Sequence, residues 1–220
     1  MKNNNRVEMI GRLEDEFRVV DEFENERFLE TKISIKRLSP TNDVLPIVVT
    51  KNRLKKQGLW KKSLKGKLIK AVGRFSSYSK SNKDGSHSLK LYVFLEEIAV
   101  MGEEFRDRTT NVISLDGYLC KDPIYRITGA EQKNNLDWHQ GKEITDLLIA
   151  TNRNKDVADY LPCITWGKDA RKASYFMMGM HVKVKGRIQS RDYYKRLPNG
   201  KGEMRTAYEI SATSIKPLED

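Results

Sequence analysis

The second half of the sequence interleaves aromatic with basic residues. These candidate positions are Trp138, Arg153, Tyr160, Trp166, Lys168, Arg187, Arg191, Tyr193, Tyr194, Lys195 and Arg196. Flat rings stack on unpaired bases and cationic side chains neutralise phosphates, so this mixture suits a single-stranded nucleic acid. Each ring could instead be buried in a core. Tyr193 and Tyr194 are adjacent in a charged run, however, and neighbours on a strand face opposite sides, so at least one should meet solvent.

The net charge also favours a polyanionic ligand. Lysine and arginine number 41 against 30 aspartate and glutamate residues, which gives a net charge of +11 and a pI near 9.5. The excess is divided almost evenly between the two halves of the chain, so a basic tail is not its source. A basic pI alone is common, but an excess spread over folded domains is typical of nucleic-acid binding.

Residue types that carry catalysis or bind metals form no known pattern here. Cys120 and Cys163 are too few for a disulfide framework or a cysteine-based zinc site, and the three histidines are scattered. Gly167-Lys168 lacks the upstream glycines of a phosphate-binding loop. We therefore expect a protein that is not an enzyme and uses no cofactor or metal. The lack of a long apolar run and of a secretory signal predicts a cytoplasmic, nucleoid-associated protein with no membrane partner.

Two similar segments follow one another along the chain. Asn5–Leu13 recurs as Asn111–Leu119, with asparagine, glycine and leucine at the same relative positions. Three further pairs of segments match, namely Ile33–Arg37 with Ile149–Arg153, Leu45–Val49 with Leu161–Thr165, and Gly66–Arg74 with Gly179–Arg187. A repeat of this kind indicates two copies of one structural unit. It predicts a first domain at residues 1–100, a polar linker at 101–110 and a second domain at 111–220.

Each repeat predicts three strands, a short helix and two more strands. Alternating apolar and polar residues mark the strands, and a glycine in the first one allows a sharp bend. The inner elements are expected as strands at 31–37, 45–50, 67–77, 145–153, 161–166 and 181–190, and as helices at 53–62 and 170–177. Asp84-Gly85 and Asn199-Gly200 indicate a turn before each closing strand. This order is that of an OB-fold, so we predict an all-β chain of two tandem five-stranded OB-fold barrels.

Five blocks of the second repeat are more specific still. They read NVISLDGYLCKDPIYR, ATNR, DYLPCITWGKDA, GMHVKVKGRIQSRDY and TAYEISATSI. In content and order they resemble the DNA-binding domain of bacterial single-stranded-DNA-binding proteins. The resemblance implies stacking positions at Tyr160, Trp166 and Tyr193. A further aromatic of the family has no clear match, and Trp138, in an earlier loop, is its candidate replacement.

The first repeat departs from this pattern. By the repeat alignment Val44 and Thr50 occupy the places of Tyr160 and Trp166, so two stacking positions are missing. The loop expected at residues 14–30 carries eight acidic residues, which would repel a phosphate backbone.

Candidate DNA contacts of the first repeat are Arg74 and Tyr78. We expect Tyr78 to contribute less than Trp166 and Tyr193. Other basic residues of this repeat gather at 51–70, where Trp60 is expected to anchor the helix on the barrel.

Single-stranded DNA binding with little sequence preference, in DNA replication, recombination or repair, is therefore the primary hypothesis. An alternative is a replication-restart or mobile-element accessory protein whose OB domains mainly bind protein partners, and a third is an RNA-binding module. The resemblance implies four OB domains per assembly, and hence a homodimer. It also implies a flexible tail with an acidic, aromatic tip that recruits replication proteins, but no such tip precedes Asp220, so this route to partners is not expected.

Overall fold

The computed structural model describes residues 4–81, 87–128, 132–133, 137–138, 141–154, 156–196, 200 and 202–219. The chain divides into two compact units. The N-unit contains residues 6–112 and 188–208, and the C-unit contains residues 1–5, 113–187 and 209–220. Residues 188–208 of the second repeat therefore group with the first repeat.

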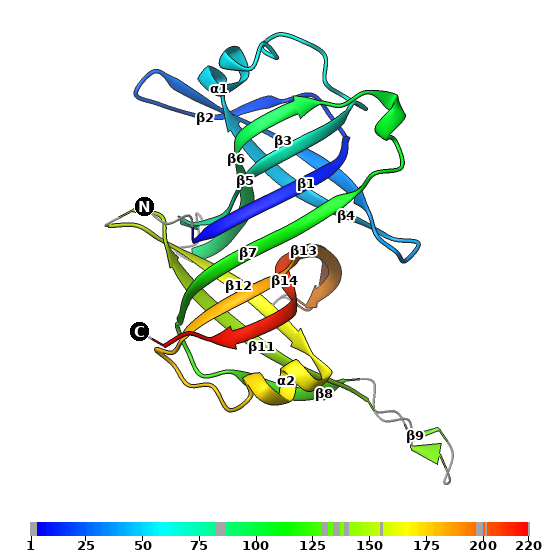
Figure 1. Cartoon of the computed structure of the whole chain (residues 1–220), viewed down its shortest axis with the longest axis vertical. Coiled ribbons are helices and arrows are strands. Elements are labelled where there is room, and N and C mark those ends of the chain that lie inside the picture. Colours follow the sequence, from blue (N-terminus) through cyan, green and yellow to red (C-terminus); the bar gives the residue numbers. More distant parts are fainter. Residues whose placement is uncertain are drawn as a thin grey trace. The chain divides into compact units, whose positions relative to one another are not determined.

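The N-unit holds the first barrel. Its strands are β1 (Asn5–Leu13), β2 (Arg18–Phe23), β3 (Glu26–Lys36), β4 (Asn42–Thr50), β5 (Leu68–Ser81) and β6 (His87–Val100). Strand β1 pairs antiparallel with β3 and β5, β3 pairs with β4, β5 pairs with β6, and the parallel pairing of β4 with β6 closes the ring (Figure 1). The closing strand thus lies between the third and the fourth strands of the ring, as in a Greek-key OB barrel.

The second barrel repeats this order. Its strands are β7 (Thr110–Leu119), β8 (Ile124–Thr128), β11 (Lys142–Asn152), β12 (Ala158–Trp166), β13 (His181–Arg196) and β14 (Gly202–Pro217). Between β8 and β11, β9 (Gln132–Lys133) and β10 (Asp137–Trp138) pair with each other in a separate two-stranded sheet. Strand β7 pairs with β11 and β13, β11 pairs with β12, and β12 runs parallel to β14, which neighbours β13. The prediction of two tandem OB-fold barrels is confirmed.

Two glycines permit the tight geometry of the first strand in each barrel. A Cβ atom added to Gly11 would lie 2.5 Å from the carbonyl oxygen of Ser34, and one added to Gly117 would lie 2.2 Å from that of Ala150. Such distances are closer than a side chain allows, so the backbones of β1 and β7 approach their partners only because these positions lack a side chain. Both repeats therefore have glycine at this position because a side chain would not fit there.

The two α-helices differ from their predicted ranges. Helix α1 (Lys51–Lys56) begins and ends earlier than predicted, since Gly58 and Lys61 adopt left-handed backbone angles that a right-handed helix cannot contain. Helix α2 (Gly167–Ala173) lies three to four residues before its predicted range, where the hydroxyl of Thr145 donates a 2.7 Å hydrogen bond to the carbonyl of Ala170. In the part of the chain that the structure describes, no helix is both long and apolar enough to span a membrane.

The acidic loop predicted at residues 14–30 is instead a β-hairpin. Strand β2 pairs with the start of β3, and Glu24 and Asn25 form the turn with positive φ angles of 47° and 64°. The hairpin base is fixed by Glu16, whose carboxylate accepts hydrogen bonds from the Ser63 hydroxyl and from the Leu64 backbone amide. These hydrogen bonds, that of Ser63 first, lower the pKa of Glu16.

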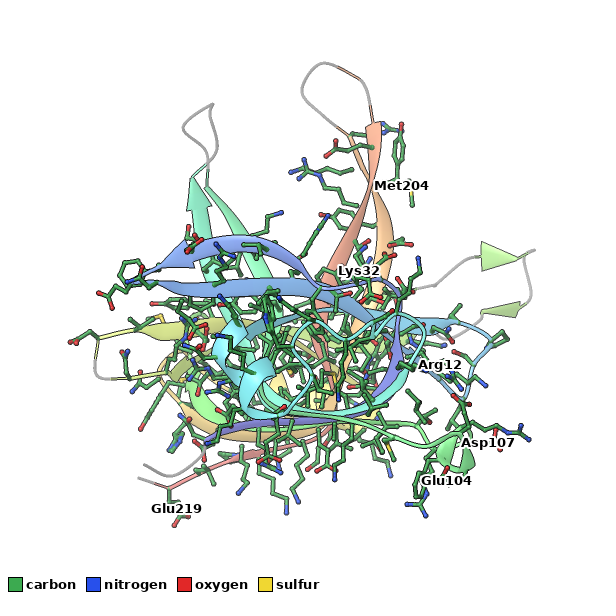
Figure 2. The ribbon with its side chains drawn as sticks, turned by 90° about the horizontal axis from the view of Figure 1, so that it is seen from above. Arg12, Lys32, Glu104, Asp107, Met204 and Glu219 are labelled. Atoms are coloured by element: carbon green, nitrogen blue, oxygen red, sulfur yellow. The ribbon has the colours of Figure 1, made fainter. Side chains whose placement is uncertain are left out.

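The segment predicted as a linker contains the short 3₁₀ helix η1 (Glu103–Phe105) and is attached to the first barrel. Arg12 donates two hydrogen bonds to the carboxylate of Glu103, at 3.1 and 2.9 Å. In Figure 2 Arg12 lies on the same side as the neighbouring Glu104 and Asp107. This bidentate ion pair fixes the path of the chain where it leaves β6.

Candidate nucleic-acid interface

Tyr160 and Trp166 lie at opposite ends of the outward side of β12, and both are exposed. The residues that alternate with them, from Asp159 to Thr165, face the core, so the pleat directs both rings outward. Tyr160 is 47 % exposed and Trp166 is 41 % exposed. They are six positions apart along the strand, or about 20 Å, a length that several nucleotides of a single strand can follow.

Three of the predicted basic residues, Arg153, Lys168 and Arg187, belong to the same C-unit. Lys168 is exposed in the first turn of α2, two residues after Trp166. Arg187 is half-buried on β13. The strand-to-helix junction therefore places a cation directly beside an exposed indole.

Arg153 has a different environment from the other predicted cations. Its guanidinium donates to the carboxylate of Asp159 through both Nε and Nη2, and Asp159 is buried. The N-unit contains the corresponding pair, in which Arg37 donates to the buried Asp43. A pair of this kind holds the loop between two strands, so a phosphate contact of Arg153, which stays a prediction, would use the 21 % of its side chain that is exposed.

The hairpin of β13 and β14 carries the remaining cations and rings of the second repeat. Arg191, Tyr193, Tyr194, Lys195 and Arg196 are all exposed, and these residues belong to the N-unit. The Arg191 guanidinium lies 5.8 Å from the centroid of the Tyr193 ring. Figure 2 marks Met204, which is also exposed, on the neighbouring strand β14. The sequence predicted that at least one of these adjacent tyrosines meets solvent, and in the structure both do.

Ser190 fixes the base of this hairpin within the N-unit. Its backbone amide donates to Asp43 at 2.9 Å and its carbonyl accepts from Arg37 at 2.7 Å. Its hydroxyl accepts from the backbone amide of Val44, also at 2.9 Å. The residues that follow Ser190 therefore extend from a rigid point.

Arg74 and Tyr78, the predicted contacts of the first repeat, point to the outside of β5. Their partners across the strand pair are Phe94 and Lys90. Tyr78 is 48 % exposed, and its pKa is raised by partial burial first and then by the negative charges of Glu30 and Asp21. Trp60 is half-buried with the Lys51 ammonium 5.4 Å from its ring, and for Trp138 the structure describes only the backbone, which pairs with Gln132.

Among the described residues, sequence reasoning missed three exposed rings of the C-unit, Tyr118, Tyr125 and Tyr175. Tyr118 is 44 % exposed and stacks on His181 of the paired strand, with ring centroids 4.4 Å apart. Its alternation with the buried Gly117 and Leu119 could have identified it as an outward residue. Among the described residues, no three histidine, cysteine, aspartate or glutamate side chains gather as a metal site.

A Greek-key barrel with this strand order is an OB fold, a class whose members bind oligonucleotides or oligosaccharides. Within that class, residues 110–218 match the Single-strand binding protein family. The Single-stranded DNA-binding protein of Clostridium tetani is 31 % identical over 115 residues, which cover 50 % of this chain and 70 % of that protein. Single-stranded DNA-binding protein B of Bacillus subtilis is 36 % identical over 90 residues, or 38 % of this chain and 71 % of its own. The chain belongs to the single-strand binding protein family.

The solved structures extend the likeness of fold to both repeats. The wild-type single-stranded DNA binding protein from Thermus aquaticus has a TM-score of 0.71 at 18 % identity and covers 98 % of this chain and 93 % of that one. A deletion mutant of the same protein is 22 % identical, with the same TM-score, and covers 98 % and 95 % of the two chains. At these identities the comparison establishes a shared tandem fold.

Proposed function

We propose that this protein binds single-stranded DNA with little sequence preference and protects it during replication, recombination or repair. The observation that carries the proposal is the pair of exposed rings, Tyr160 and Trp166, on the outer side of β12. Bases of any sequence can stack on such rings because every base has a flat face, and each stack contributes roughly 1–3 kcal/mol. The relatives named above are single-stranded-DNA-binding proteins by name.

Each group of residues has a distinct task in this proposal. Tyr160, Trp166 and Tyr193 stack on bases, and Tyr194 adds a further exposed ring beside Tyr193. Phosphates are neutralised by lysine and arginine of α2 and of the β13–β14 hairpin, namely Lys168, Arg191, Lys195 and Arg196. Arg187 and the exposed part of Arg153 are further candidate phosphate contacts of the C-unit.

The assembly that we propose is a homodimer. Two OB barrels per chain give four per dimer, the number that the family resemblance implies. The net charge of +11 on each chain would steer DNA to such an assembly and make its affinity strongly dependent on salt. Sedimentation equilibrium of the chain with and without DNA measures this state directly.

The test is a titration of the chain with oligothymidylate, followed by tryptophan fluorescence. We expect quenching of the exposed Trp166 on binding, weaker binding to a duplex of the same length, and weaker binding to oligouridylate. Equal affinity for the duplex, or no binding of either single strand, would reject the proposal. Tighter binding to oligouridylate would instead favour an RNA-binding module.

A further inference from the structure

The first repeat does contain exposed rings, but on different strands from the second. In the second repeat Trp166 on β12 lies opposite Ile144, and in the first repeat Thr50, which replaces that tryptophan, lies opposite Phe28. Residues directly opposite one another in a sheet point to the same side. The first repeat thus has a ring, Phe28, on the side of its barrel that corresponds to that of Trp166. This ring is on β3, the neighbour of the strand that would carry the tryptophan.

On the closing strand, too, the first repeat has a ring where the second repeat has none. Val48 of β4 is opposite Phe94 of β6, whereas the corresponding Ile164 of β12 is opposite Ser211 of β14. Two residues before Phe94, the first repeat has Tyr92. The aromatic residues missing from β4 are therefore present on its neighbours β3 and β6.

Together with Tyr78 of β5 these rings form two pairs, and both pairs lie on one side of β6, where Tyr92 and Phe94 are two residues apart. Phe28 and Phe94 have ring centroids 6.4 Å apart, and Tyr92 meets Tyr78 edge to face at 5.9 Å. Because Phe28, Tyr92 and Phe94 are half-buried and Tyr78 is exposed, the row is open to solvent at its Tyr78 end. We call these four residues the N-unit aromatic row.

Cations accompany the row. The guanidinium carbons of Arg53 and Arg74 lie 5.3 and 5.2 Å from the centroid of the Phe94 ring, and Arg53 also donates to the carbonyl of Leu95 at 3.0 Å. The exposed Lys90 lies directly opposite Tyr78. Rings that hold flat guanidinium groups, with an exposed ring and a lysine at one end, match the stacking and phosphate contacts of a single strand.

Negative charge near the open end sets a limit on the affinity of this surface. Glu30 lies two residues after Phe28 on the same side of β3, and Glu30 and Asp21 both raise the pKa of Tyr78, after the larger effect of burial. Arg18 offsets part of this charge, since it lies 3.4 Å from Glu30. A phosphate backbone would meet less attraction here than at the basic hairpin of residues 191–196.

We propose that the N-unit aromatic row is a second binding surface for single-stranded DNA, weaker than the surface of the second repeat. A base stacks on Tyr78 and Tyr92, and Arg74 and Lys90 contact the adjacent phosphates. This inference rests on the proposed function, because it gives the first repeat the same ligand. It also adds ring positions to the first repeat, for which the sequence predicted two missing stacking positions and a smaller contribution from Tyr78.

The test compares two lengths of oligothymidylate on the full chain. A strand of about 10 nucleotides fits one OB domain and one of about 35 nucleotides exceeds it. In the double variant Tyr78→Ala, Tyr92→Ala we expect unchanged affinity for the short strand, about tenfold lower affinity for the long strand, and a shorter occluded length. Tyr175→Ala, which removes an exposed tyrosine outside both surfaces, is the control and should change neither.

The outcomes separate this inference from the proposed function. If the wild-type chain binds neither length, the proposed function fails and the second surface fails with it. If the wild type binds both and the double variant binds the long strand equally well, only the second surface is rejected. An equal loss on both lengths would also reject it, since the rings would then belong to the main surface.

A charge variant tests the same surface without removing a ring. Glu30→Gln removes the carboxylate near Tyr78, so we expect affinity for the long strand to rise by about twofold to fivefold, the size of an exposed charge interaction. Affinity for the short strand should stay the same. Unchanged or weaker binding of the long strand would overturn the proposal and favour a basic protein partner at this face.

Discussion

The two repeats share their internal supports and differ in their outer surfaces. Both barrels have a glycine where the first strand closely approaches its neighbour, and both have an arginine paired with a buried aspartate, Arg37 with Asp43 and Arg153 with Asp159. On the outside, by contrast, the rings lie on β12 in the second repeat and on β3 and β6 in the first.

This difference has a physical explanation. A buried ion pair or a sterically restricted glycine works only in one place, because its partners are fixed by the barrel. Stacking requires only a flat ring on the accessible side, and any strand of that side can supply it. Positions inside the barrel are thus equivalent between the repeats, whereas positions on its surface need not be.

The largest expected effect concerns the shared supports. Asp43→Asn and Asp159→Asn each leave an arginine that is only 21 % exposed without its anionic partner. We expect each variant to lose about 3 kcal/mol of unfolding free energy, the lower end for a broken buried pair because some of each arginine meets water. Urea denaturation measures this loss, and a loss below about 1 kcal/mol in either variant would show that the two pairs are not equivalent supports.

The next effect concerns the hairpin that carries Tyr193. Tyr193→Ala removes a ring that lies beside the Arg191 guanidinium, and it should lower the affinity for oligothymidylate by about 1–3 kcal/mol. Tyr193→Phe keeps the ring and should retain wild-type affinity, as should the control Tyr175→Ala. If the phenylalanine variant is as weak as the alanine variant, the hydroxyl rather than stacking accounts for the contact.

A smaller effect separates phosphate contacts from base contacts. The double variant Lys195→Ala, Arg196→Ala removes two exposed cations while leaving the rings in place. The slope of log affinity against log salt concentration should become shallower by about 0.7 for each phosphate that is no longer neutralised. Titrations at several salt concentrations give this slope; an unchanged slope with lower affinity would contradict a phosphate role.

The smallest expected effect concerns the acidic hairpin of β2 and β3 in the first repeat. Because hydrogen bonds from Ser63 and the Leu64 amide lower the pKa of Glu16 in the folded chain, its contribution is present above the unfolded pKa and is lost as pH falls through the folded value. Glu16→Gln should therefore lower the melting temperature at about pH 7 and have less effect near about pH 3. An equal difference at both pH values would mean that the ionised carboxylate is not the stabilising form.

The sequence predicted the barrels well for two reasons. Alternating apolar and polar residues mark each strand, and the internal repeat shows that the same order of strands occurs twice. It missed β2 because all six residues of that strand are exposed, so no apolar face marks it. It extended the first helix too far, although Gly58, which adopts a left-handed angle just after the helix, is a residue type that commonly ends one.

The site was predictable only in part. The alternation in DYLPCITW identifies Tyr160 and Trp166 as residues of one side, and their exposure agrees with it. The pairing of Arg153 with Asp159 was missed because it needs the two strands on either side of the loop to be in register. The N-unit aromatic row was missed for a similar reason, because a repeat alignment compares like positions and not neighbours across a sheet.

The most direct test of the central claim is the affinity of the variant Tyr160→Ala, Trp166→Ala for an oligothymidylate of about 10 nucleotides. With roughly 1–3 kcal/mol for each stack, we predict a loss of about thirtyfold or more, with the fold and melting temperature retained because both side chains are outward. Wild-type affinity in this variant would contradict the account, since it would mean that the exposed side of β12 does not bind the strand.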